Sequence, residues 1–314
     1  MWFCAVAGRG TLDGTDREER AMGTTAEVDL QAALEAAELH PWNLGVPPAP
    51  PRPEPRRLTV DQVTHYVEEG WVLVDGLFDP GRLDAVRQAI DPYERRVNDL
   101  LRQVDGGRIS VAIADALTVA LHPSVLDQTC RDLAYDPALA DVTHDLIGPD
   151  VRLYWDQAVY KLPHNPDVVP WHQDNGYAYV EPQEYLTVWV PLVDATLDNG
   201  TVWVVPGGHR RGTLRHHDTD LGQRCLPETT EGAVAVEVPA GSAVAFSSLT
   251  PHRTGPNVTD GVRSAYILQY APDGAEVLEG EPASDPVRRV PCSDPDRQQP
   301  IVLRGRAVAP PPLA

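Results

Sequence analysis

The fold is decided by residues 185–206, which read YLTVWVPLVDATLDNGTVWVVP. Two runs rich in β-branched and aromatic residues flank the sequence DNG at 198–200, which is typical of a turn between strands. Similar runs, each bounded by Gly, Pro, Asn or Asp, lie at residues 151–162, 233–239, 242–248 and 263–271. Many short strands without intervening helices indicate a β-sandwich or a β-barrel.

The chain before these strands predicts helices. Thr59 is a good N-cap for an amphipathic helix, and Gly70 would end it. Residues 71–78 read as a short strand, and residues 79–101 carry apolar side chains at helical spacing. Helical character continues to about Ile147. We therefore expect a mainly β protein with flanking helices.

These patterns suggest a division of the chain. We expect a single domain at residues 56–275, with a helical N-terminal part at 56–150 and a barrel core at 151–275. The proline-rich stretch PPAPPRPEPRR ends an N-terminal extension, residues 1–55, that we predict to be disordered. Residues 276–314 are again rich in proline and charge, and predict a loose C-terminal tail.

The composition limits the partners and the cell compartment. The 314 residues carry a net charge of -20, which argues against binding to nucleic acid or to anionic membranes. The 4 cysteines lie far apart, which suits a reducing cytoplasm and not a disulfide framework. No apolar run is long enough for a transmembrane helix, and no obligate protein partner is evident. Met22 opens a more natural start, MGTTAEVDL, than Met1 does.

Residues 170–177, PWHQDNGY, place an imidazole and a carboxylate one residue apart. In a strand, residues i and i+2 point the same way, so His172 and Asp174 would face one metal ion while Gln173 points away. Taken alone, the segment is equally compatible with a surface turn, because Asp, Asn and Gly favour turns. Candidates for a third ligand are His209, His216, His217 and His252.

His252 is favoured because an arginine lies at a suitable distance after it. Arg263 is 11 residues further along, on the next predicted strand, which would return its guanidinium beneath the metal. Two histidines and one carboxylate with open coordination positions are the arrangement of non-heme Fe(II) oxygenases. A buried arginine there suits a dicarboxylate co-substrate, which it can hold in a bidentate fork.

The chain resembles the phytanoyl-CoA dioxygenase family over roughly residues 58–272. The resemblance rests on five motifs in the family's order: LTVDQVTHYVEEGWVLVDGLF, WDQAVYKLP, WHQDNGY, LTVWVPLVDATLDNGTVWVVPGGH and GSAVAFSSLTPHRTGPNVTDGVRSAYILQY. It implies a double-stranded β-helix core, which is a jelly roll of cupin type. It also implies Fe(II) as cofactor, with 2-oxoglutarate and O₂ as co-substrates.

The same resemblance assigns roles to residues. His172, Asp174 and His252 would ligate iron, and Arg263 would bind the C5 carboxylate of 2-oxoglutarate. Matching positions that assist this carboxylate or line the co-substrate pocket are Thr254, Gln157, Thr187 and Trp189.

Asp174 also bears on the reaction, because related halogenases have a small residue at this position. The expected reaction is hydroxylation, or another C–H oxidation, of a small-molecule metabolite with release of succinate and CO₂. The alternatives are a non-redox metal enzyme of cupin type, such as an isomerase, and a non-catalytic protein that binds 2-oxoglutarate or another ligand. The basic residues at 209–217 have two readings, a solvated loop and a contact for an anionic substrate.

Overall fold

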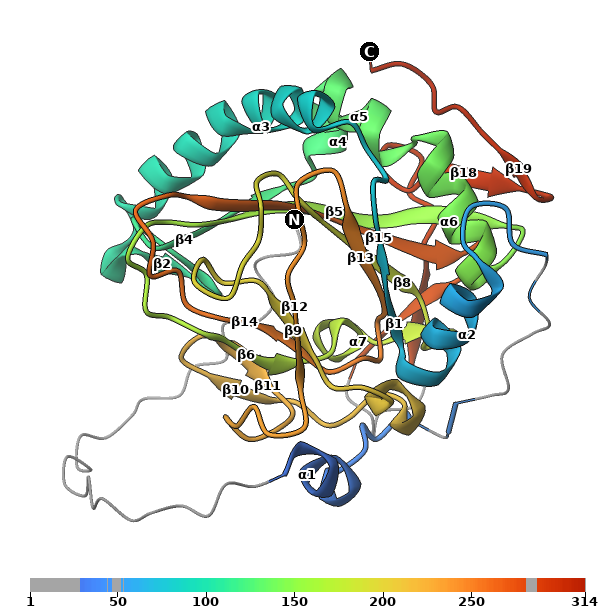
Figure 1. Cartoon of the computed structure of the whole chain (residues 1–314), viewed down its shortest axis with the longest axis horizontal. Helices are drawn as coiled ribbons and strands as arrows, with labels where there is room; N and C mark the ends of the chain where they lie inside the picture. Colours follow the sequence, from blue (N-terminus) through green and yellow to red (C-terminus); the bar gives the residue numbers. More distant parts are fainter. Residues whose placement is uncertain (1–28, 44, 47–51, 53, 281–286, 314) are drawn as a thin grey trace.

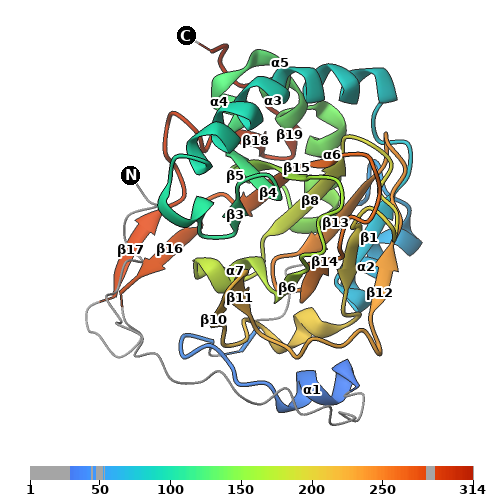
Figure 2. The same ribbon diagram turned by 90° about the vertical axis from the view of Figure 1, so that its left-hand side faces the viewer.

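The computed structural model describes residues 29–43, 45–46, 52, 54–280 and 287–313 (Figure 1). Its helices are α1 (Leu30–Ala36), α2 (Val60–Glu69), α3 (Pro80–Leu101), α4 (Pro123–Leu126), α5 (Gln128–Ala134), α6 (Pro137–Ile147) and α7 (Asp174–Tyr177), with the 3-10 turns η1 (Asp105–Gly107) and η2 (Gly208–Arg211). Figures 1 and 2 show α3, α4 and α5 at one end of the molecule and α1 at the opposite end. None of the helices in these ranges combines the length and the apolar composition that a membrane span requires.

Two antiparallel sheets form the centre of the protein. The large sheet runs in the order β1 (Trp71–Val74), β13 (Ala243–Ser247), β8 (Leu186–Pro191), β15 (Arg263–Pro272), β5 (Val151–Lys161), β4 (Leu117–Leu121), β3 (Ala112–Ile113) and β2 (Arg108–Ile109), with β18 (Pro300–Leu303) paired to β5 and β19 (Arg306–Ala307) paired to β18. The small sheet runs β12 (Val234–Val236), β9 (Val202–Val204), β14 (His252–Thr254) and β6 (Val169–His172). A separate ladder joins β10 (His217–Thr219) to β11 (Gly222–Arg224). In another, β16 (Glu276–Glu279) is the middle strand and pairs with both β17 (Arg288–Pro291) and β7 (Val180–Glu181).

The large sheet is buried on both faces. Successive residues of a strand point to opposite faces, so each central strand supplies two separate cores. Val188 faces the helices and packs in one cluster with Leu83 of α3. Trp189, the next residue, faces the small sheet and packs with Val204. Two sheets packed in this way, with helices on the outer face, confirm the prediction of a mainly β protein with a jelly-roll core.

The predicted helix signals are confirmed. Thr59 caps α2 with a complete capping box, in which its side chain and that of Gln62 each bond the other's backbone. Gly70 ends α2 with φ 81°, a left-handed conformation that favours glycine. It also has no room for a side chain, because an added Cβ would lie 2.4 Å from His209.

The helical N-terminal part contains strands that the sequence analysis missed. Residues 108–121 form β2, β3 and β4, and β4 extends the large sheet beside β5. The run LTVAL at 117–121 is short and lies between helices, so its β-branched residues give little signal alone. Pairing with the edge of β5 decides its conformation.

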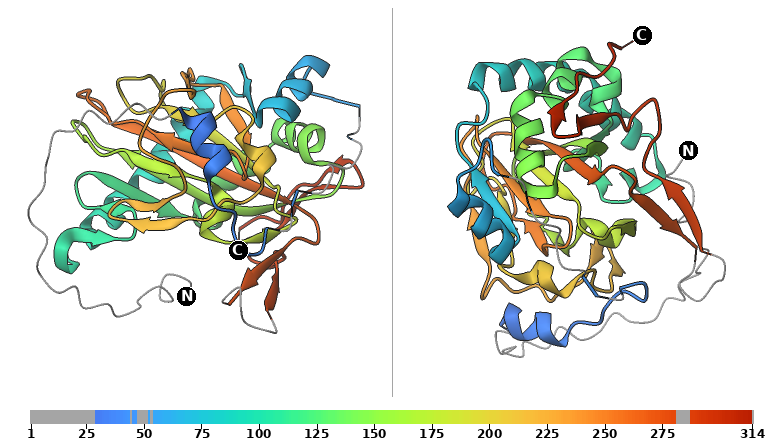
Figure 3. Two further views of the ribbon diagram at one scale, coloured as in Figure 1. Left: turned by 90° about the horizontal axis from the view of Figure 1, so that it is seen from below. Right: turned by 90° about the vertical axis from the view of Figure 1, so that its right-hand side faces the viewer.

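The prediction of a loose C-terminal tail is wrong for the described residues after 276. Figure 3 shows the red C-terminal segment running along the body of the protein. Strand β18 adds to the edge of β5, where Ile301 and Val302 are buried in the core that faces the helices. Pro300 begins this edge strand, which is one of the few positions where a sheet tolerates proline.

The predicted disorder of the N-terminal extension is wrong for residues 29–43. Helix α1 buries Leu30 and Leu34 in a cluster that contains Trp171 of β6. Residues 1–28, 44, 47–51 and 53 of that prediction lie outside the described residues. The domain limits themselves stay a prediction.

The packing of β18 predicts a measurable contribution to stability. Ile301→Ala should lower the free energy of unfolding by about 2–5 kcal/mol, because it removes a fully buried side chain and leaves a cavity. Urea unfolding of the whole chain measures this. The matched control is Val258→Ala, at a side chain that is 59% exposed, where a change below about 0.5 kcal/mol is expected. A similar small change for Ile301→Ala would contradict the docking of the tail.

Candidate metal centre

Three side chains converge between the two sheets. One ligand atom from each of His172, Asp174 and His252 lies within 4.8 Å of the other two. The two histidines are direct cross-strand partners in the β6–β14 pair, and their ring centroids are 4.2 Å apart. Asp174 Oδ1 lies 3.7 Å from His252 Nε2. Other candidate ligands, His209, His216 and His217, are not part of this group.

Main-chain carbonyls fix the tautomers of both histidines. His172 Nδ1 donates to Pro170 O at 2.7 Å, and His252 Nδ1 donates to Thr250 O at 3.0 Å. Because a carbonyl only accepts, the proton of each ring lies on Nδ1 and the lone pair of Nε2 is free. Burial, and next the proximity of His252, lowers the pKa of His172 well below its usual value. The neutral imidazole that a metal requires is therefore favoured.

Asp174 reaches the site by a different route from the predicted one. Strand β6 ends at His172, and Asp174 begins α7, so the two residues do not share one strand face (Figure 2). Gln173 does point away, as predicted, and its buried amide bonds Gly212 O at 2.9 Å and Leu214 N at 2.7 Å. These contacts turn the chain, and the turn brings the carboxylate back beside His172.

His216, which was considered as a ligand, supports this turn from behind. Its Nε2 accepts the main-chain N–H of Gln173 at 2.9 Å, and its Nδ1 donates to Leu214 O at 2.9 Å. An added Cβ at Gly176 would lie 2.1 Å from the His216 ring, so that position requires glycine. No sequence pattern distinguishes His216 from the basic residues around it.

Thr187 contacts the metal-binding carboxylate. Its hydroxyl donates to Asp174 Oδ2, and Gln269 Nε2 lies 3.5 Å from the same hydroxyl. Oδ1 is then the carboxylate oxygen that faces His252. Thr187 was predicted to line the co-substrate pocket, and its direct contact is with Asp174, a candidate metal ligand.

Arg263 is fully buried, and all three of its guanidinium nitrogens lack a hydrogen-bond partner among the described residues. Its guanidinium carbon lies 5.6 Å from the centroid of the Trp189 ring, a cation–π contact. Burial lowers the pKa of Arg263 to about 10. Buried charges are normally paired, so a buried cation without a partner in the described part of the chain is a candidate binding site for an anionic ligand.

A second buried cation lies beside Arg263. Lys161 is its cross-strand partner on β5, and Lys161 Nζ donates to Asp167 O at 3.0 Å and to Thr254 Oγ1 at 3.3 Å. Burial, followed by the charge of Arg263, lowers the pKa of Lys161 well below its usual value. Lys161 was not among the predicted site residues, although it lies four residues after Gln157 on the same strand and therefore shares its face.

Gln157 lies on the same inner face of β5. It is opposite Ile267 of β15, between the Lys161–Arg263 pair and the Trp155–Gln269 pair. The structure thus places all eight predicted site residues on the inner walls of the jelly roll or at its rim.

The basic residues at 209–211 have another use. They contact carbonyl groups at the C-terminal ends of helices, which lack partners inside the helix and attract positive charge. The contacts are His209 to Val67 O, Arg210 to Glu68 O and Arg211 to Ala37 O. These three residues therefore serve the packing of α1 and α2, which neither reading of the loop anticipated.

The arrangement suits a divalent transition metal. Two neutral imidazoles and one carboxylate on one side of the ion leave the remaining positions open, as in non-heme Fe(II) sites. The guanidinium of Arg263, which has no hydrogen-bond partner among the described residues, adds a place for an anion on the inner face of the large sheet.

The contact between Thr187 and Asp174 leads to a prediction. Thr187→Val keeps the shape of the side chain but removes the hydroxyl, so Fe(II) should bind about 10- to 100-fold more weakly. Anaerobic calorimetric titration of the metal-free protein with Fe(II) measures this. Thr187→Ser retains the hydroxyl and should bind within about threefold of wild type. Equal Fe(II) affinity in the valine variant would rule out this role.

Comparison with known proteins places the chain among relatives. Residues 66–265, well over half of the chain, match the family described as Phytanoyl-CoA dioxygenase (PhyH). A phytanoyl-CoA dioxygenase of Arabidopsis thaliana is 30% identical over 155 residues, which cover 48% of this chain and only 54% of that protein. L-proline trans-4-hydroxylase of Streptomyces griseoviridis is 26% identical over 238 residues, which cover 67% of this chain and 85% of that enzyme.

Solved structures share the fold. The epimerase SnoN, in complex with Fe3+, alpha ketoglutarate and nogalamycin RO, superposes with a TM-score of 0.57 at 23% identity, covering 76% of this chain and 97% of SnoN. EctD from S. alaskensis superposes with a TM-score of 0.58 at 19% identity, covering 75% and 84%. The chain therefore belongs to the phytanoyl-CoA dioxygenase family, whose members are Fe(II)- and 2-oxoglutarate-dependent oxygenases.

Proposed function

We propose that this protein oxidises a C–H bond of a small-molecule metabolite, with hydroxylation as the expected outcome, and that 2-oxoglutarate is consumed to give succinate and CO₂. His172, Asp174 and His252 would hold Fe(II). When bound, the metal supplies the activation of O₂, for which side chains have no equivalent chemistry.

The observation that carries the proposal is the state of Arg263. A fully buried guanidinium without a partner is costly, and it is retained where a ligand completes it. Its planar fork matches the geometry of a carboxylate, which it can bind through two hydrogen bonds. Thr254 and Lys161 lie on the same side and would add a hydroxyl and a positive charge around that carboxylate.

The remaining residues of the site would bind, orient and exclude water. The carbonyls of Pro170 and Thr250 keep the two imidazoles in the tautomer that binds a metal. Thr187 orients the carboxylate of Asp174. Phe246 packs against His252 with ring centroids 4.5 Å apart, and Trp189 lies against the guanidinium of Arg263, so both would keep water away from the site.

Two features support hydroxylation of a small metabolite. Asp174 supplies a carboxylate where related halogenases have a small residue, so halide binding is disfavoured. One relative, which covers 67% of this chain, is an L-proline trans-4-hydroxylase. The identity of the substrate and the position of attack are open to screening.

An assay of co-substrate consumption tests the proposal. The protein incubated with Fe(II), ascorbate, O₂ and 2-oxoglutarate should form succinate even without its substrate, and faster with it. His172→Ala should form none, because two ligands hold Fe(II) poorly. A folded, iron-loaded wild type that binds 2-oxoglutarate without turnover would instead be a binding protein. One that neither binds nor consumes it would favour the non-redox metal enzyme of cupin type.

Arg263→Met should have effects of opposite sign on stability and on binding. The pKa shift from 12.5 to about 10 implies that the buried charge costs the folded state roughly 3 kcal/mol. Without metal and 2-oxoglutarate, the variant should therefore melt at a higher temperature than wild type. Its affinity for 2-oxoglutarate should fall roughly 30- to 5000-fold, because a buried charge pair is lost.

Calorimetric melting and 2-oxoglutarate titration of the Fe(II)-loaded protein measure the two effects. His164→Gln, at an exposed residue outside the site, is the control for the charge-independent cost of a substitution. A destabilised Arg263→Met protein that still binds 2-oxoglutarate normally would mean that the arginine is a structural residue.

A further inference from the structure

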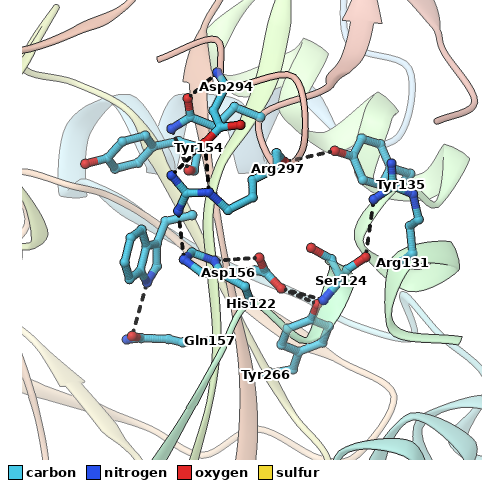
Figure 4. Close-up of polar contacts among 12 residues, drawn as sticks. His122, Ser124, Arg131, Tyr135, Tyr154, Asp156, Gln157, Tyr266, Asp294 and Arg297 are labelled. Carbon is cyan, nitrogen blue, oxygen red and sulfur yellow. Dashed lines mark hydrogen bonds and ion pairs between the residues drawn. The ribbon is translucent and has the colours of Figure 1, made fainter. Parts of the chain in front are cut away.

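A chain of polar contacts connects the C-terminal segment to the inner wall of the jelly roll (Figure 4). Arg297 Nη1 lies 2.9 Å from His122 Nε2, and His122 Nδ1 lies 3.3 Å from Asp156 Oδ1. A guanidinium only donates hydrogen bonds, so His122 Nε2 is the acceptor. The proton of the imidazole is then on Nδ1, where it is donated to Asp156.

Asp156 anchors this histidine from the outer face of β5. Its carboxylate is almost fully buried, and Oδ2 accepts the Ser124 N–H at 2.9 Å and the Tyr266 hydroxyl at 2.7 Å. His122 itself has φ 53°, a left-handed conformation that is uncommon for residues other than glycine. The surrounding contacts hold the imidazole in one orientation despite this strained backbone.

The other end of the chain of contacts is equally fixed. Asp294 Oδ2 accepts from Arg297 Nε at 3.1 Å and from Arg297 Nη2 at 3.0 Å. This leaves Arg297 Nη1 directed at His122, as Figure 4 shows. The guanidinium is therefore shared between one carboxylate and one imidazole.

His122 connects the polar contacts on the outer face of β5 to Trp155 on its inner face. Its ring packs edge-on against Trp155, with centroids 4.2 Å apart and an interplanar angle of 69°. The indole N–H of Trp155 donates to Gln157 Oε1 at 3.2 Å. Trp155 and Gln157 are two residues apart on one strand and so share the inner face, opposite to Asp156.

The hydrogen bond between Trp155 and Gln157 bears on the candidate site because of where Gln157 lies. Gln157 lies in register between Gln269, which contacts the Thr187–Asp174 pair, and Arg263. Because Trp155 occupies its amide oxygen, the group that Gln157 presents to a ligand is its NH₂ donor. A donor suits the carboxylate and keto oxygens of 2-oxoglutarate.

We propose that Arg297, His122 and Trp155 are positioning residues that fix the amide of Gln157 with its NH₂ group toward the co-substrate. The C-terminal segment thereby takes part in co-substrate binding. The inference rests on the proposed function, because it takes 2-oxoglutarate as the ligand.

Two substitutions interrupt the chain of contacts at different links. Trp155→Phe keeps the ring against His122 but removes the indole N–H. Arg297→Met keeps the length of the side chain but removes the donor to His122. Arg288→Gln is the matched control, because Arg288 lies in the same C-terminal segment, is largely exposed and pairs only with Glu279 among the described residues.

Anaerobic titration of each Fe(II)-loaded protein with 2-oxoglutarate gives the affinity, and succinate formation gives KM and kcat. Trp155→Phe and Arg297→Met should each raise the 2-oxoglutarate Kd and KM about 3- to 10-fold. The kcat should stay within about twofold of wild type, and so should Fe(II) affinity. The double variant should bind no more weakly than the weaker single variant, because both act on one contact. Arg297→Lys keeps a donor and should restore part of the affinity.

Three results would overturn the inference while leaving the proposed function intact. Arg297→Met with a lower melting temperature but an unchanged 2-oxoglutarate Kd would make Arg297 a structural clamp only. An effect of Trp155→Phe without one of Arg297→Met would end the chain of contacts at the indole. An equal loss in Arg288→Gln would make the effect non-specific. A wild-type protein that does not bind 2-oxoglutarate overturns the proposed function and this inference together, which the wild-type titration identifies first.

Discussion

The register between β6 and β14 is the constraint on which the site depends. His172 and His252 are direct cross-strand partners, so their rings meet only in this pairing. Side chains alternate along a strand, and a slip of one residue would send one of the two imidazoles to the opposite face. The third ligand is independent of this ladder, because the chain leaves it at His172. The hydrogen bonds of Gln173, including one to His216, hold the turn that brings Asp174 beside the two histidines.

Under the proposed function, the buried guanidinium of Arg263 marks where the fold gives up stability for binding. Asp145 is a contrasting buried charge with partners, because it accepts the main-chain N–H groups of Arg56, Arg57 and Leu58. Arg263 has no such compensation, and the neighbouring Lys161 adds a second buried cation. Two adjacent buried cations repel each other, and binding of a dianion such as the proposed 2-oxoglutarate would relieve this repulsion.

Much of this arrangement could be predicted from the sequence, because strand alternation and helix caps are local signals. Thr59, Gly70 and the paired positions 172 and 174 were identified in this way, although the last pair is joined by a strand–helix boundary and not by one strand. The roles of Lys161 and His216 depend on which segments meet in three dimensions, and no spacing encodes that. The tail was misjudged because its prolines suggest looseness, whereas Ile301 and Val302 find an open sheet edge at β5.

Two segments outside the central strands, α1 and the C-terminal segment, support the strands that bear the candidate site residues. Helix α1 packs against Trp171, the residue before His172, and Arg297 contacts His122, whose ring packs against Trp155. Each segment is distant in sequence from the residue it supports, so the barrel alone leaves that side chain with fewer contacts. Precision in the site requires that the supporting side chains be locked by packing and hydrogen bonds. The candidate site is therefore built in two layers, with its residues on or beside the inner strands and part of their support on the segments before and after the barrel.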